Sequence, residues 1–224
     1  MIAVAVAAYG ISPDDFIRRN TRVFEKREIQ LSVSCEKVPD ATHPSWVHFY
    51  EMPGKMTIFN HSATVNYAIR KAIEELKCDV VIQTCIDILF TSECLQNVED
   101  VVDDDTGIDN NYSMVESEDK LVYEKLINVS HAGCMALTAR NWFLLHGWNE
   151  RMYGWGWDDT DFAERAGKLV HLIAVDNVPL YHINHIQRMG DGKFYANRND
   201  KNNWESLYGP KWEEPEWGKA KFLV

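Results

Sequence analysis

Apolar positions in the first half of the chain predict alternating strands and helices. Residues 2–8 and 79–86 are almost continuously apolar, as expected of strands that are buried on both faces of a sheet. Helical spacing or alternation predicts two helices, at 13–26 and from about 60 to 77, and two further strands, at 29–35 and 46–50. Strands that alternate with helices predict an α/β fold whose central sheet is mostly parallel and flanked by helices.

The second half has a weaker pattern, and we expect shorter elements there. A short helix is predicted at 92–98, a strand end and a helix at 136–147, a helix at about 159–166, and strands at 169–175 and 180–185. Gly167 is expected to end the helix that begins near residue 159, because glycine favours the left-handed position after a helix. No internal repeat or Pro/Gly/Ser linker interrupts the chain, so we expect one domain over residues 1–224.

Charge and composition disfavour nucleic acid as a partner and a position within a membrane. The formal net charge of −11 disfavours broad contact with a nucleic-acid backbone, because such contact needs clustered Lys and Arg. No apolar run has the length of a membrane helix, and no basic segment precedes residues 2–8 as it would in a signal peptide. The five cysteines form no CxxC pair. We therefore expect a cytoplasmic protein with reduced thiols and no membrane span.

The stretch 154–161, Gly-Trp-Gly-Trp-Asp-Asp-Thr-Asp, has the most unusual composition in the chain. Asp158 and Asp161 can stabilise the start of a helix, but a helix start does not require the two tryptophans before it. About twenty residues later, His182 and His185 lie three positions apart. Carboxylates, imidazoles and flat aromatic rings together suit a site for a metal ion, a sugar and an anion.

Asp87 is expected at the mouth of the same site. It follows the apolar strand 79–86, and ligands of open α/β sheets bind beyond the carboxyl ends of the strands. Asp87 and His185 offer an oxygen and a nitrogen ligand, which suits Mn²⁺ or Mg²⁺. His182 joins them only if the chain turns between the two histidines, because a strand places residues three apart on opposite faces.

Three segments between residues 62 and 188 resemble the GT-A glycosyltransferases, in particular those that share the C-terminal motif of the galactosyltransferases. Residues 61–88 resemble the family's helix and its strand with an Asp-x-Asp motif, here Cys85-x-Asp87. Residues 133–161 resemble its Gly-Trp-Gly-x-Glu/Asp-Asp block, and residues 181–188 resemble the strand that supplies a late metal-binding histidine.

The resemblance implies a Rossmann-like GT-A fold. It further implies a metal-dependent transfer of a sugar from a nucleotide sugar, most simply a UDP-sugar, to an acceptor hydroxyl with inversion. The expected parts are a nucleotide-binding half (1–90), an acceptor and catalytic half (91–190), and an aromatic tail or lid (191–224).

The resemblance also assigns roles to particular residues. Asp159 matches the catalytic base, and Asp158 is expected to bind acceptor or donor hydroxyls. The implied donor or sugar contacts are Ala8, Tyr9, Asn66, Cys85, Trp155, Gly156, Trp157 and Arg188. Two positions depart from the family pattern: Cys85 replaces a carboxylate with a thiol, which is a weak acceptor, and Trp157 stands where relatives often have a further glycine.

Two other classes of function stay open. A non-catalytic carbohydrate-binding module would use Trp155, Trp157 and the aromatic tail, but it would not need Asp87, Asp159 and His185 to converge. A nucleotidyltransferase is disfavoured because residues 7–12 contain neither Lys nor Arg to hold phosphates. The acceptor is open as well, among a glycan, a protein side chain, a small molecule and a modified nucleic-acid base.

Overall fold

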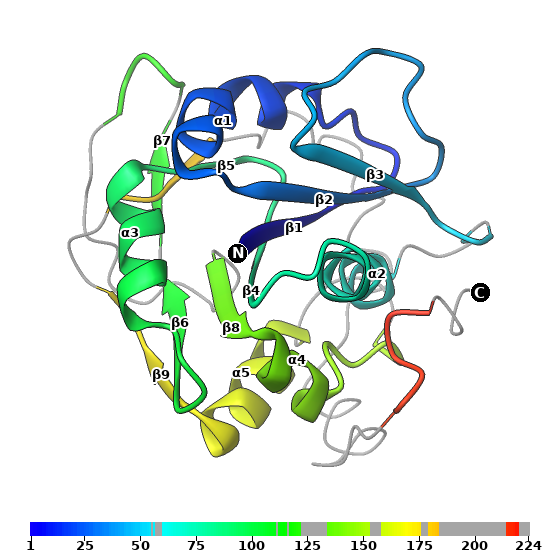
Figure 1. The fold of residues 1–224 in the computed structure, drawn as a ribbon, viewed down its shortest axis with the longest axis vertical. Helices are drawn as coiled ribbons and strands as arrows, with labels where there is room; N and C mark the ends of the chain where they lie inside the picture. Colours follow the sequence, from blue (N-terminus) through cyan, green and yellow to red (C-terminus); the bar gives the residue numbers. More distant parts are fainter. Residues whose placement is uncertain are drawn as a thin grey trace.

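A seven-stranded sheet forms the centre of the protein, with strand order β3-β2-β1-β4-β8-β6-β9 (Figure 1). The computed structural model describes residues 1–54, 56, 60–110, 112–115, 117–121, 134–152, 158–175, 179–183 and 214–219. The strands are β1 (Ile2–Ala8), β2 (Gln30–Cys35), β3 (Val47–Glu51), β4 (Val80–Thr84), β5 (Ile88–Leu89), β6 (Thr106–Asn110), β7 (Ser113–Val115), β8 (Cys134–Thr138), β9 (His171–Ile173) and β10 (Tyr181–Ile183). The helices are α1 (Asp14–Arg27), α2 (His61–Glu74), α3 (Ser92–Val101), α4 (Ala139–Leu145) and α5 (Asp158–Leu169).

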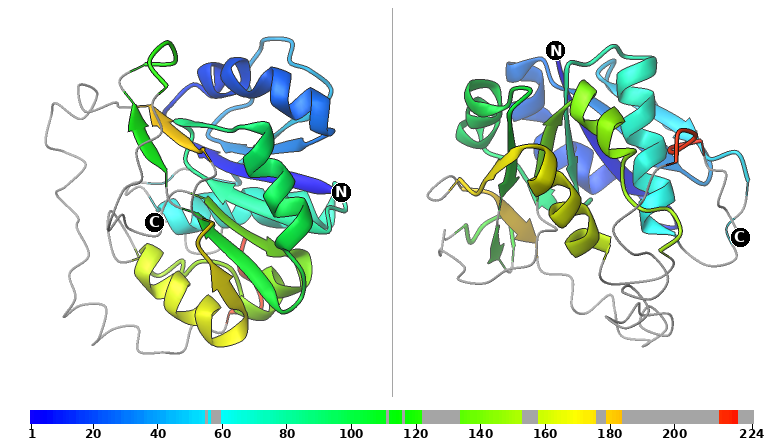
Figure 2. Two further views of the ribbon diagram at one scale, coloured as in Figure 1. Left: turned by 90° about the vertical axis from the view of Figure 1, so that its left-hand side faces the viewer. Right: turned by 90° about the horizontal axis from the view of Figure 1, so that it is seen from below.

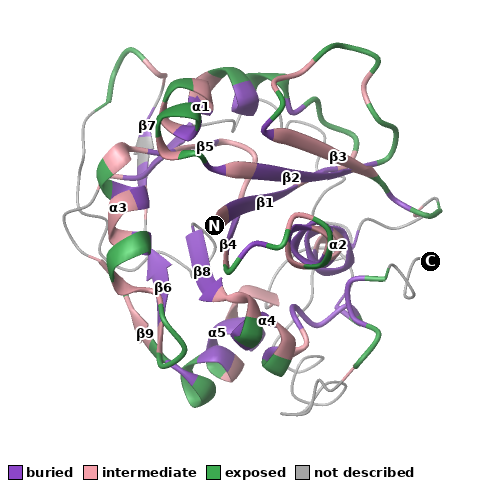
Figure 3. Cartoon of the chain, viewed as in Figure 1, coloured by how far each residue is buried: buried purple, intermediate pink, exposed green. Residues whose placement is uncertain are grey.

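The first half forms the regular part of the sheet, as its apolar pattern predicts. β1 pairs in parallel with β2 and β4, and β2 pairs in parallel with β3. Alternate residues of β1 enter two different cores: Val4 and Val6 pack on the side of α1 and α3, whereas Ala3 and Ala5 pack on the side of α2, α4 and α5. The sheet is therefore covered by helices on both faces, and its central strands are buried, whereas the edge strands β3 and β9 are partly exposed (Figure 3).

The second half departs from a purely parallel sheet. β8 runs antiparallel to both of its neighbours, β4 and β6, while β9 is again parallel to β6. The sheet is thus mostly parallel, which confirms the predicted fold class. The apolar pattern did not predict β6, whose Gly107 lies so close to β8 that a Cβ atom there would stand 2.4 Å from Leu137 Cδ2.

Gly167 does not end α5, contrary to expectation. The helix continues to Leu169, and Val170 N–H still donates to the Ala166 carbonyl over 2.9 Å. Gly167 does not take the left-handed conformation that a glycine C-cap requires.

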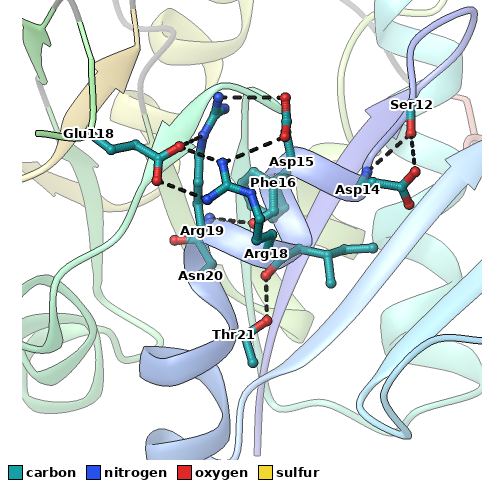
Figure 4. Close-up of polar contacts among 10 residues, drawn as sticks. Ser12, Asp14, Asp15, Phe16, Arg18, Arg19, Asn20, Thr21 and Glu118 are labelled. Carbon is teal, nitrogen blue, oxygen red and sulfur yellow. Dashed lines mark hydrogen bonds and ion pairs between the residues drawn. The ribbon is translucent and has the colours of Figure 1, made fainter.

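A second, three-stranded sheet lies beyond the end of β4, in the order β5-β10-β7. β10 pairs antiparallel with β5 and in parallel with β7, so the three short strands lie side by side. Figure 2 shows β7 (green) and β10 (orange) as neighbours. The segment after β7 is attached to α1 by Glu118, which accepts from Arg18 Nη2 at 2.6 Å and from Arg19 Nε at 2.7 Å (Figure 4). Within the described part of the chain, no helix is long and apolar enough to cross a membrane.

Candidate active site

Cys85 and Asp87 lie in the turn that joins β4 to β5, at the carboxyl end of the central strand. β4 ends at Thr84, so the Cys85-x-Asp87 motif lies in the turn after the strand and not on the strand, where the family resemblance had placed it. Ile88 N–H donates to the Cys85 carbonyl at 3.3 Å, and the Asp87 carbonyl accepts from Ile183 N–H at 3.0 Å. The turn is therefore held between its own strand and β10.

His182 meets Asp87 across this junction. His182 Nε2 lies 3.2 Å from Asp87 Oδ1, and the two side chains are 10% and 19% exposed. A carboxylate oxygen and an imidazole nitrogen that converge at a strand end fit a manganese-like ion. Among the described residues, no group of three or more His, Cys, Asp or Glu side chains is placed to hold a metal, and His185 lies outside those residues.

The three carboxylates at the start of α5 have different surroundings. Asp158 Oδ2 lies 3.1 Å from His61 Nδ1, at the first turn of α2. Asp159 Oδ1 accepts from Thr160 N–H at 2.8 Å. Asp161 is buried and pairs with Arg165 Nη2 at 2.8 Å. Asp161 thus stabilises the helix, whereas Asp158 and Asp159 remain partly exposed.

The negative charges of the β4–β5 turn and of the start of α5 act on the same two side chains, Cys85 and Tyr112. Burial raises the pKa of the Cys85 thiol, and the negative charges of Asp87, Asp158 and Asp159 raise it further. Burial also raises the pKa of Tyr112 to about 12, with added contributions from Cys85, Asp87 and Asp159. The end of β4 and the start of α5 therefore form one electronegative region, in which Cys85 and Tyr112 stay protonated at neutral pH.

Aromatic rings hold α5 in place beside this region. The Phe162 ring stacks on Trp148 and on Trp142, with ring centroids 4.6 and 5.0 Å apart. The rings of Trp148 and His61 meet edge to face, with centroids 5.8 Å apart. Arg165 Nη1 donates to the Leu145 and Gly147 carbonyls at 2.8 and 3.0 Å. The turn before the acidic block is therefore fixed to the helix that carries the block.

A buried polar frame supports the same turn from α2 and from the C-terminal segment 214–219. Asn66 Nδ2 donates to Trp148 O and to Glu150 Oε1, each at 2.8 Å, and Asn66 Oδ1 accepts from Trp148 N–H at 2.8 Å. Glu150 Oε1 also accepts from Gly218 N–H at 2.6 Å, and burial raises the pKa of Glu150 to about 7. Arg70 Nη1 donates to the Trp217 carbonyl at 2.5 Å.

Asn66 has a different position from the one that the family resemblance implied. It is fully buried, and both of its donor hydrogens bind the Trp148–Glu150 turn. In this arrangement Asn66 orients the turn and does not present its amide to a donor sugar.

The remaining candidates are only partly placed. Ala8 ends β1 and is buried, and the Tyr9 hydroxyl accepts from Met56 N–H at 3.1 Å. Both lie at the carboxyl edge of the parallel strands, as Cys85 does. Trp155, Gly156, Trp157, Arg188 and nearly all of the tail lie outside the described residues.

Three residues of the region were missed by sequence reasoning. His61 directly follows Asn60, whose side chain caps α2. Its place at the start of a helix could therefore have been predicted from the sequence. Glu150 lies within the 133–161 block, but nothing in the sequence singled it out. Tyr112 is isolated in a polar stretch, and nothing in its local pattern indicates that its ring stacks on His182 at 4.7 Å.

Comparison by sequence gives a partial family match. The model for the N-terminal domain of galactosyltransferase matches residues 113–187, less than half of the chain. The matched residues include Asp158, Asp159 and His182. A comparison with curated protein sequences finds no match.

Comparison by structure gives matches over most of the chain. The catalytic domain of Drosophila β1,4-galactosyltransferase 7 in complex with xylobiose is 12% identical with a TM-score of 0.54, and the match covers 84% of this chain and 73% of that one. A mutant of the same enzyme in complex with manganese, UDP-Gal and xylobiose matches with 12% identity, coverage of 89% and 81%, and a TM-score of 0.56. S. aureus TarS 1–349 is 12% identical with a TM-score of 0.57 and coverage of 81% and 60%; TarS is also known in complex with UDP-GlcNAc.

These matches define the class of the fold. The mostly parallel seven-stranded sheet with helices on both faces is the GT-A glycosyltransferase fold.

Proposed function

We propose that this protein is a metal-dependent glycosyltransferase that moves a sugar from a UDP-sugar to an acceptor hydroxyl. The observation that carries the proposal is the convergence of Asp87 and His182 with the acidic start of α5 at the carboxyl edge of the sheet. Ligands of open α/β sheets bind at this edge. The complexes of the structural neighbours with UDP-Gal and UDP-GlcNAc support a donor of this type.

Asp87 and His182 are the described residues that would hold the ion, with His185 as a further candidate. When bound, Mn²⁺ or Mg²⁺ would offset the charge that develops on the leaving diphosphate. The surroundings of Asp87 favour a cation because Asp158 and Asp159 add negative charge to the same region.

Asp159 is the proposed general base. Its carboxylate is oriented by Thr160 N–H and remains partly exposed, so it can reach an acceptor hydroxyl. As that oxygen attacks the anomeric carbon, Asp159 takes its proton, and the bond to the diphosphate breaks on the opposite side of the carbon. The configuration of the sugar is therefore inverted. Asp158, held by His61, is suited to accept hydrogen bonds from sugar hydroxyls.

The test is an assay of UDP release from a panel of UDP-sugars with Mn²⁺. We expect release with at least one donor and loss of release in a chelator. Asp87→Asn should abolish it, whereas Asp79→Asn, a matched change at an exposed acid that pairs with the N-terminus, should not. Sugar binding without UDP release would favour the carbohydrate-binding module, and pyrophosphate release from a nucleotide would favour the nucleotidyltransferase. The acceptor and the cytoplasmic location stay predictions.

A further inference from the structure

Tyr112 packs against His182, one of the two described residues of the proposed metal site. It immediately precedes β7, is partly buried, and stacks its ring on the imidazole of His182 with 4.7 Å between centroids and 27° between planes. The imidazole therefore has an aromatic ring against its face while its Nε2 atom points to Asp87 Oδ1.

The position of Tyr112 is itself well determined. Ser113 N–H donates to the Leu180 carbonyl at 2.8 Å, and the β7–β10 register sets Ser113 beside Tyr181. Beyond β7, Glu118 binds Arg18 and Arg19 of α1 (Figure 4). The chain that follows the ring is thus attached at two points, so the ring can limit the rotation of a side chain packed against it.

We propose that Tyr112 is a positioning residue for His182, and that its ring keeps the imidazole aimed at the metal position beside Asp87. The inference rests on the proposed function, because His182 matters to activity only if it binds the metal. An imidazole that is already oriented loses less rotational freedom when it binds an ion, and the groups that orient metal ligands commonly change metal affinity by roughly 10- to 100-fold. Tyr112 does not touch the reacting atoms and is not a catalytic residue.

The ring and the hydroxyl of Tyr112 make separable contributions. The negative charges of Asp87 and Asp159 act on the hydroxyl, whereas the stacking on His182 involves only the ring. Tyr112→Phe removes the hydroxyl and keeps the ring, and Tyr112→Leu removes the aromatic face and keeps an apolar side chain. Orientation of His182 by stacking requires Phe to behave like Tyr and Leu to differ.

The experiment measures the dissociation constant of Mn²⁺ in the presence of UDP, by calorimetry or by the EPR signal of free Mn²⁺. We expect Tyr112→Leu to weaken Mn²⁺ binding about tenfold or more and Tyr112→Phe to change it by less than about twofold. Tyr50→Leu is the matched control, because Tyr50 is a partly buried tyrosine on β3, three strands from β4. It should leave Mn²⁺ binding unchanged, and thermal unfolding shows whether each variant is folded.

The outcomes separate this inference from the proposed function. Equal Mn²⁺ affinity in Tyr112→Leu and the unchanged protein would overturn the inference alone. A loss in Tyr112→Phe as large as that in Tyr112→Leu would also overturn it, since the hydroxyl would then carry the effect. If the unchanged protein binds no Mn²⁺ with UDP, the proposed function fails and the inference fails with it.

Discussion

Acidic side chains have opposite surroundings in two neighbouring parts of the molecule, the buried frame and the candidate site. In the buried frame, Glu150 is fully enclosed and accepts from the Asn66 amide and from Gly218 N–H. In the candidate site, Asp87 and Asp158 are partly exposed and contact imidazoles. Burial raises the pKa of Glu150 to about 7, although the hydrogen bonds from Gly218 and Asn66 act in the opposite direction.

The difference shows how carboxyl groups serve structure in one place and suit the proposed chemistry in the other. A buried carboxyl with amide partners fixes the turn that precedes the acidic block, and its burial opposes ionisation. Partly exposed carboxylates that act on the same thiol and phenol create a region that a cation would stabilise. The carboxylates that lie close together are thus the partly exposed ones, whose charge a bound cation could offset.

The largest expected effect is on turnover, and it distinguishes an acid of the candidate site, Asp159, from the acid of the buried frame, Glu150. Asp159→Asn should lower turnover by roughly a hundredfold or more while UDP and Mn²⁺ binding survive, because it removes the proton acceptor and keeps the shape. Glu150→Gln, the same change in the frame, should leave turnover close to that of the unchanged protein at neutral pH. Kinetics of both variants and NMR of the product's anomeric centre provide the measurement. A product that retains the donor's configuration contradicts the proposed mechanism.

The frame can be broken directly at Gly147, whose φ is +61°. A Cβ atom there would lie 2.4 Å from Asn66 Oδ1 and 2.5 Å from Trp217 Cε3. Gly147→Ala should lower the free energy of unfolding by roughly 2–3 kcal/mol, through overpacking and left-handed strain together.

Gly10→Ala is the matched control for the strain alone. Gly10 has a φ of +70° and no atom within 4 Å of the added Cβ, so the loss should be about 1 kcal/mol. Urea unfolding compares the two variants. Equal losses would mean that close packing against Asn66 and Trp217 contributes nothing.

The pH dependence of stability tests the neutral state of Glu150. Its pKa is raised from 4.5 to about 7 in the folded protein, so the folded state holds the proton after the unfolded state has lost it. This contribution to stability is present below the unfolded pKa and is lost as pH rises toward the folded pKa. Between about pH 5 and about pH 7.5 the loss should be roughly 2 kcal/mol.

Glu150→Gln should flatten that part of the stability profile, because the side chain no longer titrates. Thermal unfolding across the pH range compares the variant with the unchanged protein. A profile of the same slope in both would show that Glu150 is ionised in the folded state throughout.

The smallest effect concerns an acid of a third kind, Glu118, which is partly exposed and paired with guanidinium groups (Figure 4). Hydrogen bonds from Arg18 and Arg19 lower the pKa of Glu118 from 4.5 to about 2. Its contribution is therefore present above the unfolded pKa and lost as pH falls through the folded value. Glu118→Gln should cost less than about 1 kcal/mol, and less still at high salt. Asp119→Asn, at the exposed neighbouring position, should cost nothing measurable in the same unfolding experiment.

Local pattern predicted most of the fold in the first half. β1, α1 and β2 match the expected ranges to within a residue or two, because each buries an apolar run or stripe of its own sequence. β6 and the antiparallel course of β8 were not predicted. Their stability depends on pairing with distant strands, and five-residue segments such as Thr106–Asn110 carry little periodicity.

The candidate site, like the fold, could be predicted only in part from the sequence. Residue type, spacing and the family resemblance predicted Asp87, Asp158, Asp159 and the two histidines as candidates. Sequence spacing favoured His185 over His182 as the metal ligand, and the structure places His182 beside Asp87. Asn66 was assigned to the donor, but its amide is used within the frame.

The sequence by itself determined most of the strands and helices in the first half of the chain and which residue types are candidates for the site, since both follow from local composition and periodicity. Only the tertiary structure decided which side chains meet. Tyr112 reaches His182 across seventy positions of sequence through the pairing of β7 with β10. Glu150 meets Gly218 because the segment 214–219 packs against α2 and the Trp148–Glu150 turn. Such contacts depend on the packing of separate elements, and no local pattern in either partner encodes them.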